Sequence, residues 1–171
     1  MFGWFKNKDE KANRKQASVL YETVRAALAE DDDVTVRIVA SVAALSVCVA
    51  YADLDYAAVE EDVLRRTLER VHGLDDQGVQ TILRVVRDHT VTITGAEATS
   101  YARELLELTE EDFRLEVLDV LLDLAASDDE ISVAETNMLR GVVVALGLTQ
   151  AQYNASQARH REKLGVLSGR S

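Results

Sequence analysis

The 171-residue sequence contains no proline. Ordinary usage of about 5% would give roughly eight or nine prolines. Because proline removes a backbone donor and clashes with the preceding helical turn, a proline-free chain rich in Ala, Leu, Val, Glu and Arg favours helices. A chain of this length can also bury one hydrophobic core without disulfides or metal ions. We therefore expect an all-α fold, a compact bundle of about seven to eight helices.

Capping signals divide the apolar periodicity into separate helices. Gly73 and Gly147 indicate helix ends. The acidic run 30–33 precedes an apolar segment and is interpreted as its N-terminal cap. Helix starts are indicated by the pairs Thr94–Glu97, Thr109–Asp112, Ser132–Glu135 and Thr149–Gln152. The predicted helices span 16–29, 34–52, 56–71, 75–89, 97–108, 110–126, 133–146 and 150–162.

Charge and composition limit the location and the partners of the chain. The net charge is -11, and because residues 1–15 are basic, the remainder carries about -14. This field repels nucleic acid and favours metal cations or basic protein surfaces. The single Cys48 cannot form an internal disulfide and no signal peptide is recognised, so we expect a cytoplasmic protein. The longest uncharged stretch, 38–52, is too short to span a bilayer and predicts a central buried helix.

The first fifteen residues combine aromatic and basic side chains. One interpretation is weak, reversible contact with the inner face of the membrane, with the aromatic rings entering the interface beside anionic lipids. The other is a flexible leader without a binding role. We expect a leader over 1–15, a helical domain over 16–165 and a disordered tail over 166–171. The predicted membrane contacts are Phe2, Trp4, Phe5 and Lys6.

The second half of the chain repeats the first. At an offset of 75 residues, an apolar helix leads into an acidic turn and then into an amphipathic helix in both copies. After one residue slips, the Gly-Leu pair at Gly73 matches the pair at Gly147. We therefore expect two related helical units. The matching acids are Asp53 with Asp128, Asp55 with Glu130 and Glu60 with Glu135.

These two motifs, Ala52-Asp53-Leu54-Asp55 through Glu60 and Ser127-Asp128-Asp129-Glu130 through Glu135, each followed by Gly-Leu, resemble the TerB-like tellurite-resistance family. The likeness covers about residues 30–160 and is closest to the short, stand-alone bacterial members. The resemblance implies an all-helical fold of about seven helices and an acidic surface with divalent-cation sites. It also implies a role in stress response or protein assembly, and no established catalysis.

The acidic turns are candidate sites for calcium or another divalent cation. Asp128, Glu130, Ser132 and Glu135 have the spacing of positions 5, 7, 9 and 12 of an EF-hand loop, but Leu124 and Ala126 stand at the two earlier ligand positions. Each copy therefore supplies part of a ligand set. The alternative is that these acids only cap helices, since Ser132 and Glu135 form a capping box. The candidate metal ligands are Asp53, Asp55, Glu60, Asp128, Glu130 and Glu135.

Other chemically active side chains show no catalytic pattern. Cys48 lies in an apolar run and is interpreted as a buried small hydrophobe. The histidines lack zinc-site spacing, and His72 and His89 are interpreted as cations at helix ends. A solvated acidic face is expected on the helix over 110–126, where one acid could also lend a ligand to the second turn. Its members are Glu116, Asp119 and Asp123.

These observations favour a non-enzymatic, acidic binding module. In the first hypothesis the turns bind divalent cations and the charged surface binds a protein partner. In the second the chain is a metal-independent scaffold or co-chaperone-like adaptor, loosely attached to the inner membrane face. Paired carboxylates alone, without a nucleophile or a cofactor motif, give little support for an enzyme.

Overall fold

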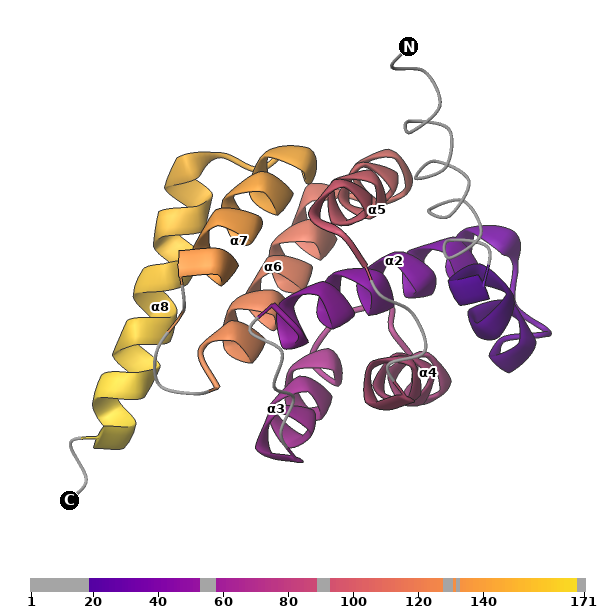
Figure 1. Cartoon of the computed structure of the whole chain (residues 1–171), viewed down its shortest axis with the longest axis horizontal. Coiled ribbons are helices and arrows are strands. Elements are labelled where there is room, and N and C mark those ends of the chain that lie inside the picture. The colour runs from indigo at the N-terminus through magenta and orange to yellow at the C-terminus, as the bar shows by residue number, and fades with distance from the viewer. Residues whose placement is uncertain (1–18, 53–57, 89–92, 128–130, 132, 169–171) are drawn as a thin grey trace, which may run out of the picture.

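The computed structural model describes residues 19–52, 58–88, 93–127, 131 and 133–168, with 58–60 and 162–168 described as backbone only. Residues 19–27 are helical. Seven further helices follow (Figure 1), and no strand occurs within these ranges. The all-α prediction is confirmed. The helices are α2 (Asp33–Ala50), α3 (Ala58–Leu68), α4 (Asp76–Asp88), α5 (Gly95–Leu108), α6 (Glu111–Ala125), α7 (Val133–Ala145) and α8 (Gln150–Ser168).

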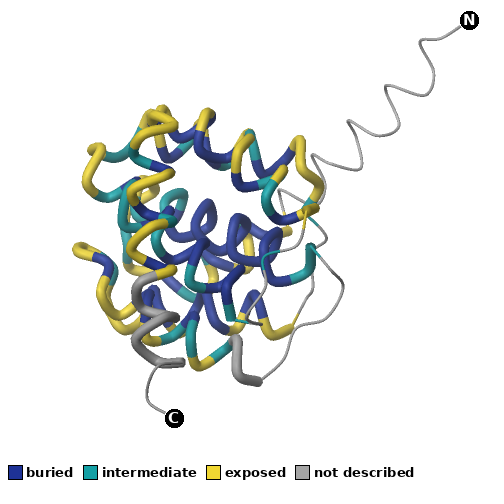
Figure 2. The backbone as a smooth tube through the Cα atoms, turned by 90° about the vertical axis from the view of Figure 1, so that its left-hand side faces the viewer, coloured by how far each residue is buried: buried dark blue, intermediate teal, exposed yellow. Residues whose placement is uncertain are grey.

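The helix α2 lies at the centre of the fold and contacts α4, α5, α6 and α7. By length and composition its 18 residues could cross a membrane, which corrects the expectation that this segment is too short. However, 67% of α2 is buried inside the protein, as Figure 2 also shows for the middle of the fold. The prediction of a central buried helix is confirmed, because protein rather than lipid surrounds most of its apolar surface.

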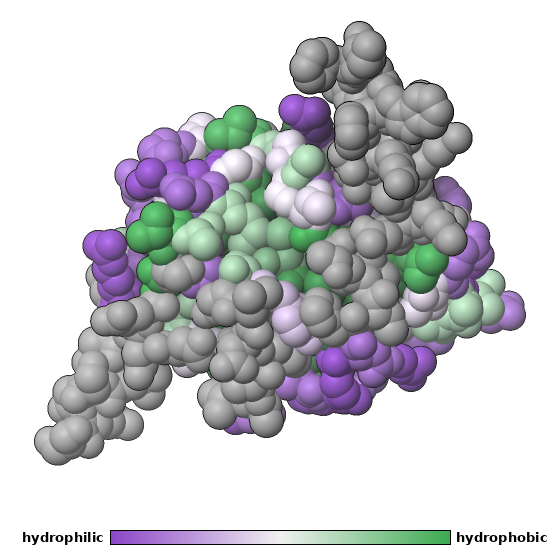
Figure 3. Space-filling model, in the orientation of Figure 1, coloured by the Kyte–Doolittle hydropathy of each residue, from purple (hydrophilic) through white to green (hydrophobic). Residues whose placement is uncertain are grey.

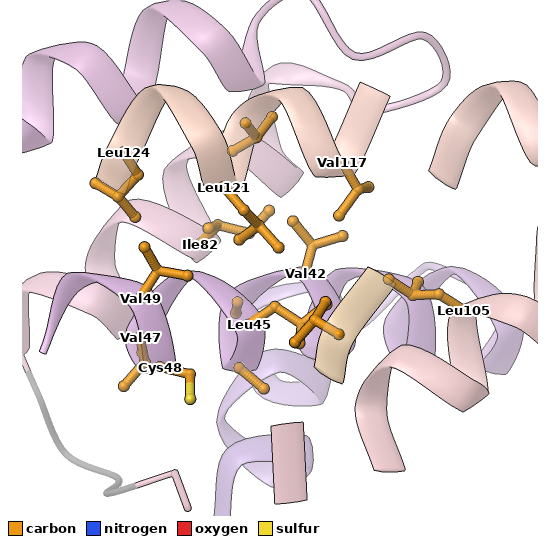
Figure 4. Close-up of a cluster of buried hydrophobic side chains, with 14 of the residues drawn as sticks. Val42, Leu45, Val47, Cys48, Val49, Ile82, Leu105, Val117, Leu121 and Leu124 are labelled. Atoms are coloured by element: carbon orange, nitrogen blue, oxygen red, sulfur yellow. The ribbon is translucent and has the colours of Figure 1, made fainter. Parts of the chain in front are cut away.

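The core joins α2 to α6. Val42 and Val49 of α2 point toward Val117 and Leu121 of α6, whereas Cys48 points to the other side of α2 (Figure 4). All of these side chains are buried. Branched aliphatic side chains on two facing helices interdigitate at crystal-like density, so a lost methyl group in this layer leaves a cavity.

Most of the predicted caps are present. Asp32 caps α2 by accepting a hydrogen bond from the Thr35 backbone N–H, and Thr94 forms a complete capping box with Glu97 at α5. The box of Thr149 with Gln152 is also formed, with backbone bonds of 2.8 and 3.2 Å. One pair is wrong. Thr109 is the C-cap of α5, and its hydroxyl donates to the Leu105 carbonyl instead of capping α6.

Both predicted glycine stops adopt the left-handed conformation, with φ of +88° at Gly73 and +69° at Gly147. At the end of α7 the Leu148 N–H donates to the Val143 carbonyl and the Gly147 N–H to the Val144 carbonyl, each at 3.1 Å. This pair of bonds is a Schellman motif. The chain therefore reverses after α7 while the Val143 and Val144 carbonyls keep hydrogen-bond partners.

The structure reproduces the repeat helix by helix. The starts of α3 and α7 are 75 residues apart, and those of α4 and α8 are 74 apart. At the same offset of 75, the C-caps Tyr51 of α2 and Ala126 of α6 each donate to the carbonyls four and two residues before them. The two units are interlocked, since α2 contacts α6, α3 contacts α6, and α7 contacts α2.

Candidate functional site

Most of the predicted metal ligands lie outside the described residues. Of the six, only the side chain of Glu135 is described, in the first turn of α7, where it is 5% exposed. Within the described part of the chain, no group of three or more His, Cys, Asp or Glu side chains could hold a metal ion. Calcium binding therefore stays a prediction. Outside the description are Asp53, Asp55, Asp128 and Glu130, together with the side chain of Glu60.

The predicted membrane contacts also lie outside the described residues, and so does His89. The leader therefore stays a prediction, like the division into 1–15, 16–165 and 166–171. The helix α8 continues to Ser168, six residues beyond its predicted end at 162. The predicted membrane contacts are Phe2, Trp4, Phe5 and Lys6.

The acidic face of α6 is not the solvated surface that the sequence suggested. Asp123 is covered by α8, where His160 Nδ1 lies 2.7 Å from Asp123 Oδ1. On its other side the Thr67 hydroxyl of α3 donates to Asp123 Oδ2 at 3.1 Å. His160 is 6% exposed. Since a buried charge needs a polar partner, this pair fixes α8 against α6.

Asp119, one turn earlier on α6, faces the same helix. Arg159 Nη2 donates to Asp119 Oδ1 at 3.1 Å and to the Ser156 hydroxyl oxygen at 2.8 Å. Burial acts to raise the pKa of Asp119, but hydrogen bonds from His160 and Ser156 and the charge of Arg159 outweigh it, and the pKa lies below its ordinary value. Asp119 is therefore ionised at neutral pH.

Glu116, at the start of this face, binds the chain beyond α3. Its carboxylate accepts from the His72 backbone N–H at 2.8 Å, and its other oxygen lies 2.6 Å from His72 Nδ1. The His72 side chain is 90% exposed. Each acid that was expected to face solvent thus has a specific partner on another segment. Periodicity showed that the three share a face, but it did not show that α8 and the end of α3 cover it.

A cavity of about 390 Å³ lies beside the Asp123–His160 pair, between α6, α7 and α8. One wall is apolar and the other carries two exposed arginines. Figure 3 shows hydrophobic surface (green) reaching solvent between strongly hydrophilic regions (purple) on one face of the molecule. Pockets of this size with a few polar groups are the usual form of a small-ligand site. The lining residues are Leu122, Ala126, Ile131, Thr136, Arg140, Gln157, His160 and Arg161.

Cys48 has no nucleophilic character. Its side chain is 8% exposed, and burial, with a smaller contribution from the charge of Glu97, raises the pKa of the thiol to about 11. Reactive cysteines are thiolates near neutral pH. The interpretation of Cys48 as a small buried hydrophobe is confirmed.

A sequence profile of the family described as tellurite resistance protein TerB matches residues 40–158. The chain belongs to the TerB family. The match begins within α2 and ends within α8, so it contains both acidic turns and most of the interlocked core of the TerB fold. No curated protein and no solved structure matches the chain. TerB is not a known family of enzymes.

Sequence reasoning missed the role of α8 in this TerB domain. In the sequence His160 is only one of three histidines without zinc-site spacing. A signal was available in the spacing of Tyr153, Ser156 and His160, which puts all three on one face of a helix. The structure shows that this face is buried. Tyr153 and Ser156 mark the inner face of α8, and a histidine on that face needs a polar partner inside the protein.

Proposed function

We propose that this chain is a non-enzymatic binding module of a tellurite-resistance-type assembly, in which both acidic turns bind a divalent cation, calcium or another. The supporting observation is the register of the helices around the turns. Helices α3 and α7 begin one repeat of 75 residues apart, so connections of equal length join equivalent helices. At the same offset in the sequence, Asp53, Asp55 and Glu60 align with Asp128, Glu130 and Glu135.

Burial of Glu135 supports a special role for the second turn. Its side chain is 5% exposed at the first turn of α7. A carboxylate is rarely buried unless cations or hydrogen-bond donors compensate the lost hydration. The net charge of -11 adds a long-range attraction for cations and for basic surfaces of partner proteins.

The test is thermal unfolding in calcium and in chelator. A ligand at 100 times its Kd adds about 2.7 kcal/mol to the free energy of unfolding. We expect a higher Tm in 10 mM calcium, a smaller shift in the double variant Asp53→Asn with Glu60→Gln, and an unchanged shift in the exposed control Glu107→Gln. Identical melting curves with calcium, other divalent metals and chelator would contradict the proposal.

A second candidate is a metal-independent adaptor at the inner membrane face. The observation that favours it is the aromatic and basic leader. Vesicles containing anionic lipid should sediment the full chain, and replacing Phe2, Trp4 and Phe5 by serine should abolish that sedimentation. Failure of the full chain to sediment would remove the membrane contact and leave a cytoplasmic adaptor, and equal sedimentation of both proteins would remove the role of the three aromatic residues.

A further inference from the structure

An ion-pair cluster joins α3 to α4 in the first unit. Glu61 of α3 accepts hydrogen bonds from both Nε and Nη2 of Arg87 in α4, the first at 2.9 Å. Arg65, one turn further along α3, lies 3.5 Å from the same carboxylate. The bond from Arg87, and then the charges of Arg87 and Arg65, hold the pKa of Glu61 below its usual range despite partial burial. One carboxylate thus serves two arginines.

The second unit keeps both arginines but has no carboxylate at the position of Glu61. At the repeat offsets of 75 in α7 and 74 in α8, Arg65 corresponds to Arg140 and Arg87 to Arg161. The position of Glu61 is taken by Thr136, whose hydroxyl carries no charge. Within the described residues, neither Arg140 nor Arg161 forms an ion pair.

A second difference between the units, beside the first, leaves room for the cavity. In the first unit Tyr51, at the end of α2, reaches α4, and its hydroxyl donates a hydrogen bond to the Val86 carbonyl at 3.0 Å. Its counterpart in the second unit is Ala126, and the counterpart of Val86 is His160. Both line the cavity of about 390 Å³. The cavity therefore lies where the first unit has an aromatic ring and a carboxylate.

We propose that this cavity binds a small aromatic carboxylate. The ligand carboxylate lies between Arg140 and Arg161, as the Glu61 carboxylate lies between Arg65 and Arg87. Its ring packs on the apolar wall of Leu122, Ala126 and Ile131, in the space that corresponds to the ring of Tyr51. Guanidinium groups bind carboxylates in a planar, bidentate geometry, and the apolar wall favours a ligand with an apolar body over inorganic phosphate.

The test uses 4-hydroxybenzoate as the probe, with amide NMR to locate binding and titration calorimetry to measure it. We expect shifts at residues around the cavity in the full-length protein. Thr136→Glu restores the missing carboxylate at helical spacing from Arg140 and should abolish binding. The control Thr136→Gln introduces a side chain of the same shape as glutamate but without its charge, and it should retain binding. Arg140→Met and Arg161→Met should each weaken binding about tenfold, the usual effect of losing one charge-assisted hydrogen bond.

Arg103→Met is the matched control, because Arg103 is an exposed arginine on α5 outside the cavity lining. It should leave binding unchanged. Four results would each overturn the proposal: no shifts around the cavity, equal binding of the neutral 4-hydroxybenzamide, equal binding of inorganic phosphate, or full binding by Thr136→Glu. Melting curves of all variants confirm that each one is folded before its affinity is compared.

Discussion

The α2–α4 contact and the α6–α8 contact hold the same place in the two units, but their chemistry differs. In the first unit the corresponding positions are apolar and buried, and in the second they carry ion pairs and hydrogen bonds. Duplication has preserved the frame of helices while the side chains between them diverged. The matched positions are Ala44 with Asp119, Cys48 with Asp123, Ile82 with Ser156, Val85 with Arg159 and Val86 with His160.

The difference shows which features of the repeat define the fold and which can change. The starts of the second and third helices of each unit, the acidic residues between them and the left-handed glycines keep their spacing in both copies. Packing chemistry does not, because a helix on the outside of a bundle can be fixed either by excluding water or by specific polar pairs. The first kind of contact is non-directional. The second requires each buried polar atom to have its partner.

The largest expected difference is the cost of truncation at matched positions. Ile82 is fully buried, and Ile82→Ala should lower the free energy of unfolding by about 2–5 kcal/mol through lost burial and a cavity. Ser156→Ala, at the equivalent position, removes a hydroxyl that accepts from Arg159 and donates to Asp119, and should cost about 1–2 kcal/mol. Urea unfolding of both variants measures the two costs. Equal costs would contradict the distinction between an apolar and a polar interface.

The two left-handed glycines should also differ. Gly73→Ala introduces only the strain of positive φ, about 1–2 kcal/mol, because a Cβ there meets nothing within 4 Å. At Gly147 the added Cβ would lie 2.7 Å from Leu106 Cδ1, so Leu106 must move as well. We expect Gly147→Ala to have the lower Tm of the two. A lower Tm for Gly73→Ala would show that the turn after α3 is the more constrained one.

Acid should weaken the second interface specifically. The pKa of Asp119 is lowered in the folded protein, so its contribution to stability is present above the unfolded pKa of about 3.9 and is lost as the pH falls through the folded value. Asp119→Asn should therefore lower the Tm at pH 7. The difference in Tm between the variant and the natural protein should become smaller toward pH 3. A constant difference across this range would show that Asp119 does not contribute through its charge.

The smallest effect concerns Cys48, the counterpart of Asp123. With a pKa of about 11, about one thiol in a thousand is ionised at pH 8. Reaction with a thiol reagent at pH 8 should be slow in the native protein and rapid in urea. Fast labelling under native conditions would show that this end of α2 opens locally.

Helix positions and most caps could be predicted because each depends on neighbours in the sequence, and the repeat because both copies keep the same order and spacing of residues. The capping box of Thr94 with Glu97 and the stop at Gly147 lie within a few residues. The prediction that Thr109 caps the start of α6 was wrong. The connection between α5 and α6 is so short that the same threonine can cap the end of α5 or the start of α6. In the structure the Thr109 hydroxyl donates to the Leu105 carbonyl, so it caps α5.

The contents of the α6–α8 interface could not be predicted in the same way. Asp119 and Asp123 share a helical face whether that face meets water or another helix. The decision depends on which residues α8 presents and on the path of the chain between them. The special position of Arg140 and Arg161 follows only from aligning the two units in register, because the alignment shows Thr136 where the first unit has Glu61.

The interlocking of the units bears on how the chain acquires its structure. Because α3 lies on α6 and α7 on α2, a break in the connection between α4 and α5 would not yield two independent domains. Each fragment would expose an apolar central helix to water. We expect such fragments to be insoluble alone and to recover a native complex when mixed, so that the repeat behaves as one cooperative folding unit.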